Sequence, residues 1–390
     1  MNLLFVHDFP VEFNKKTKEY YSTGFPNKIW QRYLTVFDEV SVSSRVIVNE
    51  FSDKKNLSSG VNIEFKPINE YKNLLSLFIY YNKIKKKLLS NIKESDGVLI
   101  RLPSILGFLT AHICRQLNKP YAVEVVGSMF KSYWHYGSFA SKILAIPLEI
   151  IQKYYIKNSS VVIYITDRYL QKCYPTKGVG FSQVSNVEIE EYGKLNNFIA
   201  NINKKSIIKI GMVGSTFVKY KGHKLALKMI KVLITKGYNI QFEVVGQGPS
   251  ESFLKSVKSL GLINYVNFIG KLDNRDQMNE WYKNLHIYIQ PSKTEGHGRS
   301  VVEAISNGLP VISSNVGGLP ESVSNSYLFS YGDLNKFTNL IIRTIEDSDF
   351  RNSNIKENYK NIKSNKKEIV DRKRRMALTT YKNLIKEAER

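Results

Sequence analysis

The chain is poor in cysteine, in long apolar runs and in acidic residues relative to basic ones. Its two cysteines, Cys114 and Cys173, form neither a disulfide framework nor a metal-binding pattern, so a reducing cytoplasm is the expected compartment. No apolar run reaches the ~18–20 residues that a membrane-spanning helix needs. Residues 1–6 read as a short buried strand rather than a secretion signal, because His7 and Asp8 follow at once.

The excess of basic residues is unevenly distributed. The 390 residues hold 57 Lys and Arg against 34 Asp and Glu, a net charge of +23. Residues 1–185 carry +11 and residues 351–390 carry +8. A basic surface attracts nucleic acid, anionic lipid or an anionic substrate, and compositional drift without functional meaning is the alternative. No nucleic-acid-binding motif is present, so we expect no nucleic-acid partner.

The length and an apolar content of 43% predict two domains of ordinary size. Strand-like and helix-like segments alternate in both halves, which indicates doubly wound parallel sheets of the α/β class. Within the first half, residues 7–24 read as a long loop and residues 71–93 as one long helix. The predicted organisation is a first domain of residues 1–185, a polar linker of residues 186–205, a second domain of residues 206–365 and a final helix of residues 366–390.

Two glutamates frame the most informative segment, residues 286–321, which reads as strand, loop, helix, strand and loop. Glu295 precedes a helix predicted from Arg299, and Glu303 lies inside it, so a rise of ~1.5 Å per residue separates the two carboxylates by roughly 12 Å. That separation is too long for an acid/base pair on one bond, but it suits the two ends of an extended ligand. Free N–H groups at the helix N-terminus between them favour an anion. The pattern favours a sugar, a diphosphate and a ribose in line, and chance placement of two glutamates is the alternative.

The sequence PSKTEGHGRSVVEAISNGLPVISSNVGGLPE resembles the donor-binding signature of the retaining glycosyltransferases of family four (group 1). That signature usually reads P-S-x-x-E-G-F-G-x-x-x-x-E-A-x-x-x-G-x-P-V-I, and this chain departs from it at His297, where an aromatic residue is usual. The resemblance implies a GT-B fold, in which two Rossmann-like doubly wound domains face a central cleft and a C-terminal helix returns to the first domain. It also implies that Glu295 binds hydroxyls of the donor sugar and that Glu303 holds the ribose hydroxyls.

A second glycine-containing stretch, GMVGSTFVKYKGHK, follows a predicted strand and precedes a predicted helix. Such loops at the carboxyl edge of a parallel sheet bind ligands, and lysines there can contact phosphate oxygens. An ordinary glycine turn with solvated lysines is the alternative. By resemblance, Lys221 and Gly222 match a Lys-Gly pair of the family, whereas Ser215 stands where an arginine usually clamps the diphosphate. Lys219 or Arg299 would replace that arginine, and Ser215 could still donate a hydrogen bond.

The resemblance implies a metal-independent hexosyltransferase that uses a UDP- or GDP-linked sugar, has no cofactor and retains anomeric configuration. Lys221 and Glu295 are then the catalytic candidates, with neither glutamate acting as a covalent nucleophile, and VVGQGP and VNFIGKL are weaker donor matches. The full donor-binding set is Gly214, Ser215, Lys219, Lys221, Gly246, Gly270, Lys271, Leu272, Glu295, Gly296, His297, Gly298, Arg299, Ser300 and Glu303.

The first domain matches the family only loosely. Family members often carry a Gly-Gly pair in the first loop and a histidine at a mid-domain strand end, whereas this chain has Gly24 alone and Gly127 followed by serine. His135 is a nearby substitute, and aromatic residues beside it either stack on acceptor sugars or belong to the core. The candidate acceptor residues are Gly24, Gly127, Tyr133, Trp134 and His135.

Four lysines within residues 83–87, next to aromatic residues, suit an anionic membrane surface, as they also suit a solvated helix face. The simplest hypothesis is a cytoplasmic enzyme, peripheral on the inner membrane face. Its acceptor would be a saccharide or a polyprenyl-pyrophosphate-linked glycan of a bacterial surface polysaccharide, such as capsule, exopolysaccharide or O-antigen. A GT-B sugar-nucleotide epimerase, a non-catalytic nucleotide-sugar-binding protein and a nucleic-acid-binding protein are the alternatives.

Overall fold

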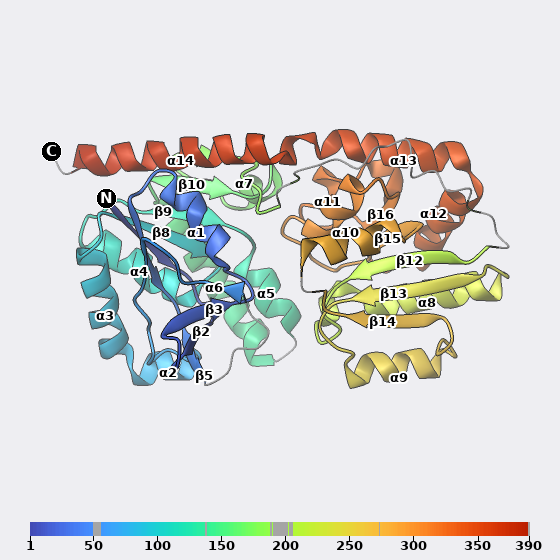
Figure 1. The fold of residues 1–390 in the computed structure, drawn as a ribbon, viewed down its shortest axis with the longest axis horizontal. Helices are drawn as coiled ribbons and strands as arrows, with labels where there is room; N and C mark the ends of the chain where they lie inside the picture. Colours follow the sequence, from blue (N-terminus) through green and yellow to red (C-terminus); the bar gives the residue numbers. More distant parts are fainter. Residues whose placement is uncertain are drawn as a thin grey trace. The chain divides into compact units, whose positions relative to one another are not determined.

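The computed structural model describes residues 1–49, 56–136, 139–187, 189, 202, 206–272 and 274–388. The chain divides into two compact units, each of which contains a parallel sheet (Figure 1). The first unit comprises Met1–Tyr133, Phe139–Val184 and Val370–Arg390, and the second comprises Trp134–Ser138 and Ser185–Ile369. Most of the predicted linker, residues 186–205, lies outside the described residues.

The first unit is built on a seven-stranded sheet with the order β11-β10-β9-β8-β1-β4-β7, and its strand pairs are parallel. In sequence order, the chain passes from the central strand β1 to β4 and β7 on one side of the sheet. It then passes from β8 to β9, β10 and β11 on the other side. Its strands are β1 (Asn2–Val6), β4 (Glu39–Ser43), β7 (Ile63–Phe65), β8 (Gly97–Leu102), β9 (Ala122–Val125), β10 (Val161–Tyr164) and β11 (Val179–Phe181).

Apolar side chains cover both faces of this sheet, as parallel strands require. Because side chains alternate along a strand, Leu4 and Val6 of β1 join one core cluster and Leu3 and Phe5 join another. Helices α3, α4 and α6 contribute to the first cluster, and α1 contributes to the second. The helices of this unit are α1 (Asn27–Leu34), α2 (Leu74–Ile79), α3 (Tyr81–Lys93), α4 (Ile105–Gln116), α5 (Met129–Tyr136), α6 (Phe139–Lys157) and α7 (Tyr169–Cys173).

Two local expectations in this unit are wrong. Residues 7–24 contain β2 (Val11–Asn14) and β3 (Glu19–Ser22), which pair antiparallel and form a four-stranded sheet with β5 (Val46–Asn49) and β6 (Asn56–Leu57). The predicted helix of residues 71–93 is interrupted at Tyr80, whose backbone (φ −107°, ψ 21°) leaves the helical region and separates α2 from α3.

The C-terminal helix α14 (Lys367–Ala388) packs on the first unit, as the predicted fold requires. Ala377, Leu378, Tyr381 and Ile385 are buried in the same core cluster as β1 and α1. The Tyr381 hydroxyl accepts a hydrogen bond from the Val98 N–H at 2.7 Å and lies 3.0 Å from the carbonyl oxygens of both Val98 and Pro120. One buried hydroxyl therefore ties the end of the chain to β8.

The second unit contains a six-stranded sheet with the order β14-β13-β12-β15-β16-β17, and its strand pairs are also parallel. One apolar core cluster runs through the unit. The strands are β12 (Ile208–Val213), β13 (Ile240–Val245), β14 (Val266–Gly270), β15 (Ile287–Gln290), β16 (Val311–Ser314) and β17 (Leu328–Phe329). The helices are α8 (His223–Thr235), α9 (Glu251–Ser259), α10 (Arg275–Lys283), α11 (Arg299–Ser306), α12 (Leu334–Glu346) and α13 (Ser348–Asn361).

Side-chain caps begin most of the helices around this second sheet. Ser250, Asn274, Asp333 and Asp347 each accept a hydrogen bond from the backbone N–H three residues further on. Such caps satisfy N–H groups that the helix itself leaves without a partner.

The two parallel sheets confirm the predicted α/β class with two doubly wound sheets. Within the described ranges, no helix combines the length and the apolar character needed to cross a bilayer.

We expect Tyr381→Phe to lower the free energy of unfolding by about 1–3 kcal/mol, because it leaves buried backbone groups of β8 without a partner. Urea unfolding measures the change. Tyr80→Phe is the matched control, since Tyr80 is exposed and should tolerate the change within about 0.5 kcal/mol. Equal stability of the two variants would show that the buried hydroxyl does not hold the C-terminal helix.

Candidate functional site

The candidate site lies where the strand order of the second sheet reverses. β12 and β15 are neighbours at the centre, and the chain continues from β12 to one edge of the sheet and from β15 to the other. The loops that follow these strands, residues 214–222 and 291–298, leave from the same carboxyl edge. In open α/β sheets this point is where ligands bind.

An ion pair joins the two loops. Lys221 Nζ lies 2.7 Å from Glu295 Oε1, and both side chains are largely shielded from solvent. Lys221 ends a single 3-10 turn, Lys219–Lys221, and Gly222 follows with a left-handed backbone at φ 84°. A Cβ at Gly222 would lie 1.7 Å from the Pro291 carbonyl oxygen, so only glycine permits this approach of the two loops.

A polar network fixes the Glu295 carboxylate. Ser292 Oγ donates to Oε1 at 2.8 Å, and Gln290 Nε2 donates to the same oxygen at 3.3 Å. Gln290 is itself held by the Tyr288 hydroxyl, which donates to its Oε1 at 2.7 Å. Tyr288 in turn accepts from the Val213 N–H of β12 at 3.2 Å. The contacts described for Glu295 converge on Oε1, so Oε2 can accept hydrogen bonds from a ligand.

The N-terminus of α11 lies between the two glutamates in the sequence. Gly298 occupies its cap position with φ 76°, and a Cβ there would come within 2.4 Å of Leu319 Cδ2. The N–H groups of Val301 and Val302 bond to the Gly298 carbonyl, which leaves those of Arg299 and Ser300 at the open end of the helix. The Ser300 hydroxyl donates to Gln290 Oε1 at 3.2 Å. The arrangement provides oriented donors for an anion.

Glu303 lies one turn further along α11. The Tyr282 hydroxyl of α10 donates to Glu303 Oε2 at 3.1 Å. Burial raises the pKa of Glu303, and the charges of Arg299 and Arg275 and the hydrogen bond from Tyr282 partly oppose that rise. In the part of the chain that the structure describes, no group of three or more His, Cys, Asp or Glu residues could hold a metal ion.

Three glycines bring neighbouring strand ends together at this edge. The Gly214 N–H bonds to the Val245 carbonyl at 2.8 Å, and the Gly246 N–H bonds to the Gly270 carbonyl at 2.8 Å. Gly246 has φ 149°, and a Cβ there would lie 2.5 Å from the Gly214 carbonyl oxygen. The predicted donor residues Gly214, Gly246 and Gly270 thus lie at the carboxyl ends of the adjacent strands β12, β13 and β14. Of their predicted neighbours, Lys271 is exposed, and Leu272 is half-buried against the core.

The position that usually carries the phosphate-clamping arginine is structurally unusual. The Ser215 hydroxyl is buried, and among the described residues it has no hydrogen-bond partner. Lys219 is exposed on the 3-10 turn. Arg299 is exposed at the first position of α11, where its charge acts on Glu303. Both cations remain candidates to replace the arginine.

His297 is a buried residue of the loop that carries Glu295. Its side chain is 5% exposed, and neither ring nitrogen has a hydrogen-bond partner within the described residues. Burial lowers the pKa of His297, although Glu321 and Asn365 partly oppose this shift. The ring is therefore neutral and fills the place of the usual aromatic residue. The preceding Gly296 is half-buried in the same loop.

The candidate acceptor residues lie on three segments: the loop after β3, the loop after β9 and helix α5. Gly24 packs beside Phe9, since a Cβ at Gly24 would lie 2.8 Å from that ring. The Gly127 carbonyl accepts from Gln152 Nε2 at 2.8 Å. Tyr133 packs against the core of the first unit, and Trp134 is 41% exposed. The side chain of His135 lies outside the described residues.

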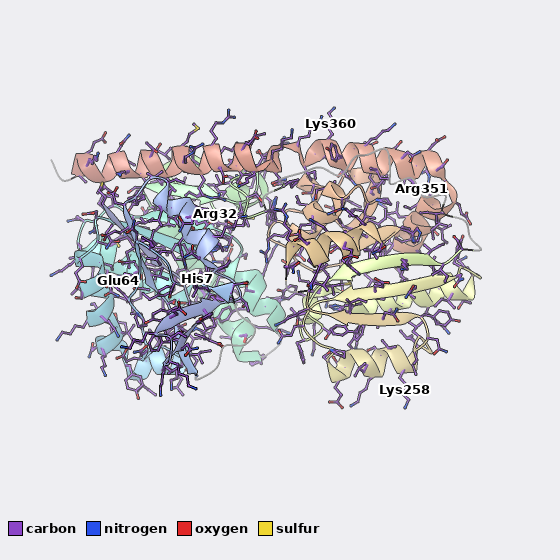
Figure 2. All side chains as sticks on the ribbon, in the orientation of Figure 1. His7, Arg32, Glu64, Lys258, Arg351 and Lys360 are labelled. Carbon is purple, nitrogen blue, oxygen red and sulfur yellow. The ribbon has the colours of Figure 1, made fainter. Side chains whose placement is uncertain are left out.

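Sequence reasoning missed a polar cluster at the carboxyl edge of the first sheet, where β1 and β8 meet. His7 (labelled in Figure 2) accepts from the Phe9 N–H through Nδ1 at 2.8 Å. Burial, with smaller contributions from Arg101 and Arg45, lowers the pKa of His7 to about 3, so its ring is neutral. Asp8 accepts from the Ile105 N–H at 2.6 Å. The pair His-Asp directly after the first strand was the available signal.

We expect Lys221→Met to lower the free energy of unfolding of the second unit by about 1–3 kcal/mol, because it removes the cation that pairs with the shielded Glu295 carboxylate. Lys219→Met is the matched control. It removes an exposed lysine two residues away and should change stability by less than about 0.5 kcal/mol. Urea unfolding distinguishes the two. A Lys221→Met protein as stable as the control would mean that the ion pair does not join the loops.

Comparisons with known proteins agree with this geometry. The family model for "Glycosyl transferases group 1" matches residues 196–361. The chain is 47% identical over 386 residues to "Protein CapJ" of Staphylococcus aureus, which covers 99% of this chain and 97% of CapJ. It is 27% identical over 179 residues to "Capsular polysaccharide biosynthesis glycosyltransferase CapM" of the same species, covering 44% of this chain and 47% of CapM.

A solved structure of HepE from Anabaena, in complex with UDP and glucose, is similar with a TM-score of 0.66 at 15% identity, covering 97% of this chain and 100% of that one. This similarity confirms the predicted GT-B fold. The family model includes both loops of the candidate site, and the relationship to CapJ extends over nearly the whole chain. The chain belongs to the group 1 glycosyl transferases.

Proposed function

We propose that the protein transfers a sugar, with retention of anomeric configuration, from a nucleoside diphosphate donor to a glycan or lipid-linked saccharide. The observation that carries this proposal is the Lys221–Glu295 ion pair at the reversal of strand order, beside the open N-terminus of α11. A cation, helix N–H groups and a carboxylate with an available oxygen meet the needs of a diphosphate and a sugar. HepE, which shares the fold, was solved with UDP and glucose.

The donor would lie along α11. Glu303 would hold the ribose hydroxyls, and the Ser300 N–H and Lys221 would contact the diphosphate. Glu295 Oε2 would accept from the sugar hydroxyls. The backbone would approach the nucleotide closely at three glycines, Gly214, Gly246 and Gly270. The residues at the border of the nucleotide would be Gly296, Gly298, Lys271 and Leu272. Either Lys219 or Arg299 would supply the second cation.

The chemistry follows from the leaving group. Cleavage of the anomeric C–O bond develops positive charge on the sugar ring and negative charge on the departing diphosphate. Lys221 and the helix N–H groups stabilise that negative charge without a metal. The acceptor hydroxyl attacks from the face that the diphosphate leaves, and its proton passes to the leaving phosphate. The configuration is thereby retained, and neither Glu295 nor Glu303 forms a covalent bond.

The proposed acceptor is a polyprenyl-pyrophosphate-linked saccharide at the inner face of the cell membrane, reached from the cytoplasm. The similarity to CapM supports a role in capsule-type surface polysaccharide assembly. The acceptor would bind near Gly24, Gly127 and the aromatic segment of residues 133–135. The cluster of His7, Asp8 and the two neighbouring arginines, Arg45 and Arg101, places a neutral imidazole, a carboxyl group and two guanidinium groups at the same type of sheet edge.

The proposal predicts that one nucleoside diphosphate stabilises the protein in the presence of EDTA. A thermal-shift panel of UDP, GDP, ADP and TDP tests this, since a ligand at one hundred times its dissociation constant adds ~2.7 kcal/mol. We expect Glu303→Ala to abolish the shift. Glu251→Ala, which removes an exposed carboxylate from α9 of the same unit, is the control and should keep it.

Three outcomes would contradict the proposal. If none of the four nucleotides stabilised the protein, the proposed donor site would be excluded. If stabilisation required a divalent cation, the metal-independent mechanism would be excluded. Conversion of the bound nucleotide-sugar into its isomer without an acceptor would instead identify an epimerase.

A further inference from the structure

Helix α6 (Phe139–Lys157) is apolar on both its inner and its outer face. On the inner face, Ala145 and Ile156 are fully buried, and Tyr155 stacks on Phe108 of α4. On the outer face, apolar side chains at helical spacing remain exposed, with Phe139 79% exposed and Ile150 62% exposed. We call this stripe the α6 outer face; it consists of Phe139, Ile143, Ile146, Ile150 and Tyr154. A helix that is apolar all round normally has all its sides covered.

A second apolar segment borders the same layer of helices. α3 packs against α4, which packs against α6 (Figure 1). Leu75, Phe78 and Ile79 of α2, just before α3, are exposed, with Phe78 77% exposed. Leu74 and Leu77 of α2 and Ile156 of α6 pack in the same apolar cluster of the first unit. The two exposed apolar segments therefore belong to the helices that cover this cluster.

The charges around these segments are almost all positive. α6 contains three lysines and one glutamate, and Glu149 turns inward, where it accepts from the Tyr174 hydroxyl at 2.8 Å and the Phe130 N–H at 2.9 Å. Lys153 and Lys157 are exposed beside the α6 outer face. α3 contributes five lysines and no acidic residue, of which Lys83 lies 3.4 Å from Glu70.

The same sign of charge extends to α4, the helix between them. Arg115 of α4 lies over the Tyr154 ring of α6 at 5.1 Å from its centroid. Lysine and arginine stems can lie along an apolar surface while their charged ends reach outward. The surface thus combines exposed apolar side chains with basic groups around them.

We propose that the α6 outer face and α2 form a docking surface for an anionic lipid bilayer. A helix that lies in the membrane interface buries an apolar face among the acyl chains and places lysines at anionic headgroups, and α6 offers both. A second copy of the chain fits this surface less well, because a two-fold contact would bring its lysines against each other. The proposal rests on the proposed function only in that a lipid-linked acceptor gives such docking a purpose.

Co-sedimentation of the full chain with vesicles tests the proposal, in the absence of donor and acceptor. We expect binding to phosphatidylcholine vesicles with 30% phosphatidylglycerol to be at least about tenfold tighter than binding to phosphatidylcholine alone, and to weaken as salt is added. The triple variant Ile143→Ser, Ile146→Ser, Ile150→Ser should lose at least about tenfold in affinity. Its thermal shift with nucleotide should be unchanged, which separates failed docking from a failed donor site.

The matched control is Leu254→Ser with Ile263→Ser, which removes comparably exposed apolar side chains from the second unit. Its vesicle binding should equal that of the wild type. Should the triple variant fail to fold, Ile150→Trp provides an independent readout, since its fluorescence should be quenched by brominated lipids. The proposal would be overturned if the triple variant still bound vesicles, or if brominated lipids did not quench the added fluorescence of Ile150→Trp. It would also be overturned if the wild type bound no vesicles but formed a dimer that the triple variant did not form.

Discussion

The contact between Lys221 and Glu295 is the interaction on which the geometry of the second unit's site depends. It joins the loops that follow β12 and β15, the two strands between which the sheet reverses its order. Gly222 makes the approach sterically possible, and Gln290 and Ser292 hold the carboxylate oxygen that Lys221 contacts. Because the pair is largely shielded, its charges act on each other and on a ligand with little screening by solvent.

Helix α11, which begins beside this pair, determines the orientation of the site. α11 starts at a glycine cap and carries Glu303 one turn along, so the open N–H groups of its first turn and a carboxylate belong to one helix. In the proposed site, this helix would hold two parts of an extended ligand at a fixed separation. The buried, neutral His297 supports the same loop from behind, where the family usually places an aromatic ring.

Much of the fold and of this site could be predicted from the sequence because both rest on local patterns. The strand–loop–helix arrangement around Glu295, its glycines and the alternation of strands and helices are readable within short windows. The small sheet of β2, β3, β5 and β6 was missed because β5 and β6 pair with segments distant in sequence. The polar cluster of His7 and Asp8 was not predicted because their partners come from other strand ends. The exposed outer face of α6 could not be predicted either, because the sequence of an apolar helix does not indicate how many of its faces other elements will cover.

In the proposed site α11 spans the donor, with Glu303 at the ribose. Calorimetric titration of the stabilising nucleoside diphosphate and of its 2′-deoxy analogue, on the wild type and on Glu303→Gln, measures this contact. A hydrogen bond to a charged group is worth about 1.5–3 kcal/mol, so the deoxy analogue should bind the wild type at least about tenfold more weakly. We expect this difference to disappear in Glu303→Gln. An equal difference in both proteins, or none in the wild type, would show that Glu303 does not hold the ribose.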